Sequence, residues 1–171
     1  IYEKMLKDAG LETTPEDIYS DEGQEIRVRA KGVTKRMQSN FLDGRLGLII
    51  DGTGKDYDKI SKQVSGLKQL GYECSMIFVN TSLQTAQERN KMRKRTLPEK
   101  QVETMWNGVQ QNMGKFQRMF GASNMIIVDN NDAGEDVFNK VWKRCAMLIR
   151  RKVSNPIAKR WISQELAKKK R

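Results

Sequence analysis

Three short apolar runs, at residues 46–50, 73–79 and 124–128, constrain the fold of this chain more than any other feature. Each run is too short to be a helix and is bounded by polar or glycine-rich residues, as buried strands are. Longer segments with helical spacing of apolar residues separate the runs. Strands that alternate with helices form parallel sheets with right-handed crossovers. The sequence therefore predicts an α/β fold with three parallel strands and helices on both faces of the sheet.

The segments around these runs contain residues that typically start and stop helices. A polar residue precedes most of the helical patterns, and the predicted N-caps are Asp21, Asp56, Thr81 and Thr96. Pro156 predicts the start of a last helix. No internal repeat, low-complexity linker or change in composition marks a boundary, so residues 1–171 are expected to form a single domain.

The run at 46–50 ends directly in Asp51, and Gly52-Thr53-Gly54 follows as a tight turn. In open α/β folds, ligands bind at the carboxyl edge of the sheet. A carboxylate at that edge suits Mg²⁺ or the phosphate side of a nucleotide enzyme. The alternative is a core strand followed by an Asx turn with no chemistry. The run alone leaves both interpretations open.

The residue types present exclude several classes of site. The chain has no histidine, which excludes Ser-His-Asp and Cys-His nucleophile systems. Gly54-Lys55 is not part of a Walker A loop, because Ile49 stands where that motif needs its first Gly. Cys74 and Cys145 lie far apart in apolar surroundings, which predicts buried, reduced thiols in a cytoplasmic protein. No apolar run reaches the roughly 18 residues of a membrane helix.

The net charge of +11 comes from the C-terminal part of the chain, because residues 137–171 contain twelve Lys or Arg and one acidic residue. Such a basic region can contact nucleic acid or an acidic partner. The simpler interpretation is a solvated helix face, since no aromatic stacking pattern or nucleic-acid motif accompanies the charge.

A second basic segment, Arg89–Arg95, places five cations in seven residues between two predicted helices. Cations this close repel one another unless they share an anion, and Arg side chains bind phosphate oxygens in a bidentate manner. The functional interpretation is a segment at about 89–97 that closes over a transferring phosphoryl group as a lid. The alternative is an exposed basic turn.

These motifs together resemble the P-loop kinases of the zeta-toxin and polynucleotide-kinase group, some of which are encoded by bacteriophages. The resemblance covers about residues 20–165 in the right order. The residues that carry it are Ile49-Ile50-Asp51-Gly52-Thr53-Gly54, Leu70-Gly71-Tyr72, Phe78-Val79-Asn80-Thr81, Glu88-Arg89-Asn90, Arg93, Arg95, Leu97-Pro98, Phe120-Gly121 and Ile127-Val128-Asp129-Asn130.

The resemblance implies a three-layer sandwich of the adenylate-kinase type, in which the three runs are the third to fifth strands. The first two strands and the P-loop would then precede Ile1, and residues 1–171 alone would be inactive. The implied activity is ATP- and Mg²⁺-dependent phosphoryl transfer to a hydroxyl of a small molecule, nucleotide sugar or polynucleotide, in the cytoplasm of a cell or phage host.

The resemblance also assigns a role to individual residues. Asp51 would contact the Mg²⁺ shell or the substrate, and Thr53 would offer its hydroxyl to substrate or phosphate. The lid arginines would stabilise the transferring phosphoryl group, and Asn130 would contact adenine; the predicted lid arginines are Arg89, Arg93 and Arg95. Two alternatives stay open: a non-catalytic basic module that binds nucleic acid through residues 137–171, and a degenerate P-loop relative that binds a partner.

Overall fold

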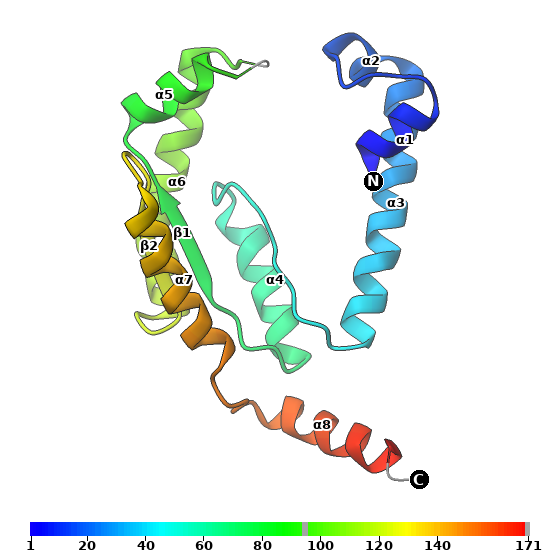
Figure 1. Ribbon diagram of the computed structural model, residues 1–171, viewed down its shortest axis with the longest axis vertical. Coiled ribbons are helices and arrows are strands. Elements are labelled where there is room, and N and C mark those ends of the chain that lie inside the picture. Colours follow the sequence, from blue (N-terminus) through cyan, green and yellow to red (C-terminus); the bar gives the residue numbers. More distant parts are fainter. Residues whose placement is uncertain (94–95, 170–171) are drawn as a thin grey trace. The chain divides into compact units, whose positions relative to one another are not determined.

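The computed structural model describes residues 1–93 and 96–169. The chain divides into two compact units, an N-terminal unit of Ile1–Asp51 and a C-terminal unit of Gly52–Arg171 (Figure 1). Of the helices in the described residues, none combines the length and the apolarity that a membrane span requires.

The N-terminal unit contains three helices, α1 (Tyr2–Asp8), α2 (Pro15–Tyr19) and α3 (Asp21–Asp43). Its core is formed by Leu6 from α1 with Ile26 and Ala30 from α3, all of which are buried. The Tyr2 hydroxyl donates a hydrogen bond to the carbonyl oxygen of Gly23 at 3.2 Å and ties α1 to the first turn of α3. A side chain at Gly23 would collide with the backbone of Asp17, so the α2–α3 corner requires glycine there.

The predicted strand at residues 46–50 does not form. In the structure these residues lie outside every helix and strand, and the Ile49 side chain is fully exposed, at 102%. A strand is held by hydrogen bonds to a neighbouring strand. The two strands that the structure describes pair only with each other. The apolar run therefore joins no sheet in the described residues, and the prediction of a strand ending at Asp51 is wrong.

The C-terminal unit contains all of the sheet and most of the helices. Its elements in chain order are α4 (Tyr57–Gln69), β1 (Met76–Asn80), α5 (Leu83–Lys91), α6 (Glu99–Phe120), β2 (Met125–Asp129), α7 (Glu135–Ile149) and α8 (Pro156–Lys169). The two strands are parallel, with Met76 opposite Met125 and Asn80 opposite Asp129. Two of the three predicted strands and their parallel direction are therefore confirmed.

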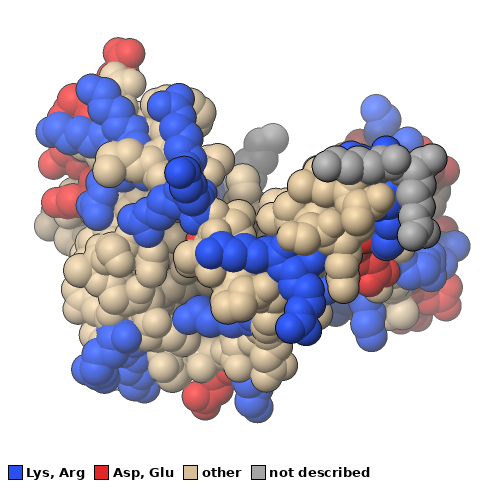
Figure 2. All heavy atoms as spheres, turned by 90° about the horizontal axis from the view of Figure 1, so that it is seen from below, with Lys and Arg blue, Asp and Glu red and all other residues tan. Residues whose placement is uncertain are grey.

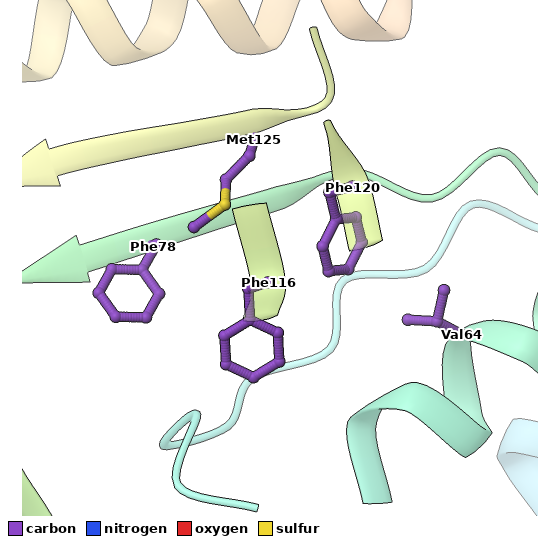
Figure 3. Close-up of a cluster of buried hydrophobic side chains, with 5 residues drawn as sticks. All are labelled: Val64, Phe78, Phe116, Phe120 and Met125. Carbon is purple, nitrogen blue, oxygen red and sulfur yellow. The ribbon is translucent and has the colours of Figure 1, made fainter. Parts of the chain in front are cut away.

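The core of the C-terminal unit lies between the sheet and the helices α4 and α6. Figure 3 shows Val64, Phe78, Phe116, Phe120 and Met125 gathered around α6. The Phe116 ring is fully buried and lies 5.4 Å from the Tyr57 ring, centroid to centroid. Cys74 packs against this cluster, and both Cys74 and Cys145 are free thiols that are half-buried rather than fully buried.

Within the described residues of this unit, the opposite face of the sheet is covered on β2 and about half exposed on β1. Alternate residues of a strand point to opposite faces, so Ile126 and Val128 face away from the Phe116 cluster; both are buried, and α7 packs on β2 (Figure 1). Ile77 and Val79 of β1, which pair with them, are about half exposed. The structure thus shows an α/β fold with a two-stranded parallel sheet.

Of the four predicted N-caps, only Asp56 is confirmed, since its carboxylate accepts a hydrogen bond from the Lys59 amide at 3.0 Å. Asp21 and Thr81 are each displaced by a neighbouring serine, because the Ser20 and Ser82 side chains accept the helix amides instead. Pro98 precedes α6 with no side-chain hydrogen bond, so Thr96 is not a cap. Ser, Thr and Asp are similarly good N-caps, so the sequence does not show which of two adjacent polar residues caps the helix.

Candidate functional site

The candidate site lies at the carboxyl edge of the sheet, where β1 ends at Asn80 and β2 ends at Asp129. The Asn130 amide donates to the Asn80 carbonyl oxygen at 2.8 Å, which extends the pairing by one residue beyond β2. Asn130 is half-buried, and the structure gives its side chain no hydrogen-bond partner in the described residues. The side-chain amide group of Asn130 is therefore available to a ligand at this edge.

Asn131 joins the loop after β2 to the loop after β1. Its side-chain oxygen accepts a hydrogen bond from the Ser82 amide at 2.6 Å. Its own backbone and side-chain nitrogens donate to Asp129 Oδ1 at 3.0 and 2.7 Å, which is the arrangement of an Asx turn. The first turn of α5 and the β2–α7 loop are therefore held together by one side chain.

Arg89 belongs to this same edge. It lies in the last turn of α5, is half-buried, and donates from its guanidinium group to the Asn131 carbonyl oxygen at 2.9 Å. The structure therefore brings the Arg89 guanidinium group to the loop that contains Asn130, although the sequence places the two residues 41 positions apart. The hydrogen bond uses one guanidinium nitrogen and leaves the others for an anion.

Helix α6 supports the loop after β1 from the side. The Trp106 indole nitrogen donates to the Thr81 carbonyl oxygen at 2.8 Å, and the Gln110 side chain donates to Asn80 Oδ1 at 2.7 Å. Both donors come from the apolar stripe of α6 or its border, so packing of that stripe fixes their positions. The end of β1 is consequently held by side-chain hydrogen bonds as well as by the sheet.

The same helix also holds the glycine-rich loop that contains Thr53. Asn112, which is only 6% exposed, donates from Nδ2 to the carbonyl oxygens of Gly54 at 3.1 Å and Lys55 at 2.9 Å. Gly54 adopts a left-handed backbone (φ 73°) beside Phe116, which favours glycine. Thr53 itself is exposed, so its hydroxyl is accessible to solvent.

The predicted lid segment coincides with a break between α5 and α6. Asn90 is buried and fixes this break, since it donates from Nδ2 to the Leu97 carbonyl oxygen at 2.8 Å and accepts from the Leu97 amide at 3.0 Å. Arg93 is exposed, with its amide bonded to the Asn90 carbonyl oxygen at 3.2 Å. Arg95 lies outside the described residues.

One ion pair spans this break. The Lys91 ammonium group lies 2.8 Å from a Glu99 carboxylate oxygen, and both side chains are exposed. The hydrogen bond between them, followed by their mutual attraction, lowers the pKa of Glu99 and raises the pKa of Lys91. An exposed pair of this kind contributes little to stability, so Asn90 is the main anchor of the break.

Asp51 is the last residue of the N-terminal unit and is exposed. Because residues 46–50 form no strand, Asp51 does not end a strand of the described sheet. Among the described residues, no group of three or more Asp, Glu or Cys side chains is gathered closely enough to hold a metal ion. The roles predicted for Asp51, in catalysis and toward Mg²⁺, stay predictions.

Sequence reasoning missed the amide side chains that organise this edge. Asn112 stands among the apolar residues of α6, three positions after Val109 and four before Phe116. A polar residue on an apolar helical stripe indicates a buried hydrogen bond, so Asn112 could have been found. Asn90 and Asn131 carry no comparable pattern, because their partners are set by loop geometry.

The comparisons place this chain in a family. The model of the zeta toxin family matches residues 16–140, which is most of the chain and includes all six predicted site residues. A search of curated proteins gives no match, and a search of solved structures gives none. The resemblance seen in the sequence is therefore confirmed at the level of the family. This chain belongs to the zeta toxin family, a P-loop kinase-like family.

Proposed function

We propose that this protein transfers the γ-phosphoryl group of ATP to a hydroxyl group of a small molecule, nucleotide sugar or polynucleotide. Membership of a P-loop kinase-like family supports an ATP-dependent kinase in general. The single observation that carries the proposal is the hydrogen bond from Arg89 of α5 to the Asn131 carbonyl oxygen, next to Asn130, at the carboxyl edge of a parallel sheet. Ligands bind at that edge in open α/β folds.

In this proposal Asn130 contacts adenine through its side-chain amide, and Arg89 lies beside it with donors left for a phosphate. Arg93 and Arg95 form the cationic part of the lid, where they stabilise charge that develops on the transferring phosphoryl group. Thr53 offers its exposed hydroxyl to the acceptor or to a phosphate. Asp51 contacts the acceptor or the Mg²⁺ shell.

The described residues fit part of the ATP·Mg²⁺ complex. A free amide at Asn130 and an exposed cation at Arg93 suit a base and a phosphate, respectively. In the glycine-rich loop, Asn112 holds the carbonyl oxygens of Gly54 and Lys55 against α6, whereas a phosphate would bind the backbone N–H groups of such a loop. When bound, Mg²⁺ would neutralise phosphate charge. A three-layer sandwich and a cytoplasmic location, where ATP is present, belong to the same proposal.

The test is a phosphoryl-transfer assay on the full-length protein with radiolabelled ATP and a panel of acceptors, including nucleotide sugars and 5′-hydroxyl oligonucleotides. Arg93→Ala should lower kcat more than it raises KM for ATP, because a lid cation acts on the transition state. Lys62→Ala, an exposed cation on α4, is the matched control and should leave both constants unchanged. Equal kinetics for both variants would assign Arg93 to the solvated surface.

A non-catalytic, nucleic-acid-binding module is the second candidate. It is favoured by the exposed cations of α7 and α8, part of the basic surface in Figure 2; within the described residues only Lys140 and Lys168 of these helices form ion pairs. This candidate predicts no phosphoryl transfer with any acceptor, and oligonucleotide binding that Lys143→Gln/Arg144→Gln weakens. Transfer that survives this double substitution supports the kinase.

A further inference from the structure

A basic groove runs along α3 in the N-terminal unit, and none of the residues assigned to phosphoryl transfer is among its lining residues. Its volume is about 480 Å³. Its lining comes from the start of α1 and the middle of α3: Ile1, Tyr2, Arg27, Ala30, Lys31, Thr34, Lys35 and Gln38. We call this feature the α3 groove. No acidic side chain is among its lining residues.

The three cations of the α3 groove form a regular row. Arg27, Lys31 and Lys35 are spaced four residues apart, so they lie on one face of the helix at intervals of about 6 Å. Like charges at this spacing destabilise a helix, by about 0.2–0.5 kcal/mol per pair. Within the described residues, none of the three has a hydrogen bond or an ion pair. The row is therefore an uncompensated charge that a polyanion with regularly spaced charges would neutralise.

The groove also has an aromatic ring and neutral polar groups. The Tyr2 ring is half-buried and held by the hydrogen bond from its hydroxyl to Gly23. The Gln38 amide is exposed, and Thr34 donates its hydroxyl to the Ala30 carbonyl oxygen at 2.9 Å. Sites that bind single-stranded nucleic acid combine a positive groove with an aromatic ring on which a base stacks. An acidic peptide would use the cations but would gain less from the ring.

We propose that the α3 groove binds single-stranded nucleic acid without sequence preference. Phosphates of the strand pair with Arg27, Lys31 and Lys35, and one base stacks on Tyr2. This binding needs no phosphoryl transfer, so it is independent of the proposed kinase activity. It is also distinct from the basic residues 137–171, which belong to the other unit.

Fluorescence anisotropy with a labelled oligothymidylate of about 16 nucleotides tests the proposal. Affinity is measured between about 50 and about 200 mM salt for residues 1–171 and for the triple variant Arg27→Gln/Lys31→Gln/Lys35→Gln. Each lost phosphate contact should reduce the slope of log K against log salt by about 0.7, so the slope should fall by about 2. Affinity at the lower salt should fall at least about tenfold.

The matched control is Lys59→Gln/Lys62→Gln/Lys68→Gln, which removes the same charge from three exposed positions on α4. Circular dichroism verifies that both triple variants keep their helices, and glutamine is a good helix former. A fall in slope in the groove variant alone supports the proposal. If the salt slope falls equally in both triple variants, the effect depends only on net charge and the proposal is wrong.

Substitution of Tyr2 separates the stacking contribution from the charge. Tyr2→Leu should weaken binding by about tenfold with the salt slope unchanged, whereas Tyr2→Phe keeps the ring and should keep the affinity. Polyglutamate and vesicles with anionic lipid serve as competing ligands. If either binds in a groove-dependent manner while oligothymidylate does not, the occupant is an acidic protein or a membrane, and the proposal is wrong.

Discussion

Two apolar runs in this chain have similar sequences and different structures. Residues 46–50 and Met125–Val128 are both short, apolar and followed by an aspartate. The second run is β2, with Met125, Ile126 and Val128 buried and a full set of parallel partners in β1. The first run has no partner strand and exposes Ile49 completely. A run of apolar residues therefore indicates a strand only when a second strand is available to it.

The aspartates that follow the two runs differ for the same reason. Asp129 ends a paired strand, and its carboxylate organises the next loop by accepting two hydrogen bonds from Asn131. Asp51 follows a run that forms no strand, and it is exposed. An aspartate that follows an apolar run can therefore have a structural role, as Asp129 does. Asp51 has no such role in the described part of the structure, so a functional role is open to it.

The largest expected effect is on stability, and it differs between the two apolar runs. Ile126→Ala should destabilise the protein by about 2–5 kcal/mol, because it removes a buried side chain that is 3% exposed. Ile49→Ala should change stability by less than about 0.5 kcal/mol, since its side chain already contacts water. Urea unfolding followed by circular dichroism measures both. Equal losses of stability would show that residues 46–50 are packed in solution.

The loops after the two runs provide the second prediction. The loop after the first run, Gly52–Lys55, depends on the buried Asn112. Asn112→Ala should destabilise the C-terminal unit by about 1–3 kcal/mol, because it removes the donor from two carbonyl oxygens beside the core. Gln111→Ala, at an exposed position on the same helix, is the control. The fluorescence of the tryptophans, all of which lie in this unit, reports the unfolding. If the two variants are equally stable, the hydrogen bonds from Asn112 do not stabilise the loop.

The sequence predicted the elements whose determinants are local. The periodicity of α6, the cap at Asp56 and the start of α8 at Pro156 were all readable in the chain. The hydrogen bonds of the candidate site were not, because they join residues far apart, such as Asn112 to Gly54 and Arg89 to Asn131. The prediction of a strand at 46–50 was wrong for the same physical reason, because a strand needs a partner that can lie far away in the sequence.

The third prediction uses activity to separate the two aspartates. In the full-length protein, Asp51→Asn should lower the rate of phosphoryl transfer by about tenfold or more with stability unchanged, because a carboxylate charge near Mg²⁺ or the acceptor is lost. Asp129→Asn should have a smaller effect on the rate, since an amide oxygen can still accept from Asn131. If Asp51→Asn retains full activity, Asp51 is only a turn residue, for which Asn is an equivalent cap.

The smallest expected effect concerns the segments that precede β1 and α8. Glu73 accepts hydrogen bonds from the Ser154 hydroxyl and amide, and these contacts lower its pKa below the ordinary value. A lowered folded-state pKa stabilises the protein above the unfolded-state pKa, and the contribution is lost as the pH falls below about 4.5. Because Glu73 is exposed, Glu73→Gln should cost only about 0.5 kcal/mol at neutral pH, and the difference from the unsubstituted protein should vanish in acid. Glu103→Gln, an exposed control on α6, should show no such pH-dependent difference. A Glu73→Gln loss that persists in acid would assign the effect to packing rather than to the carboxylate charge.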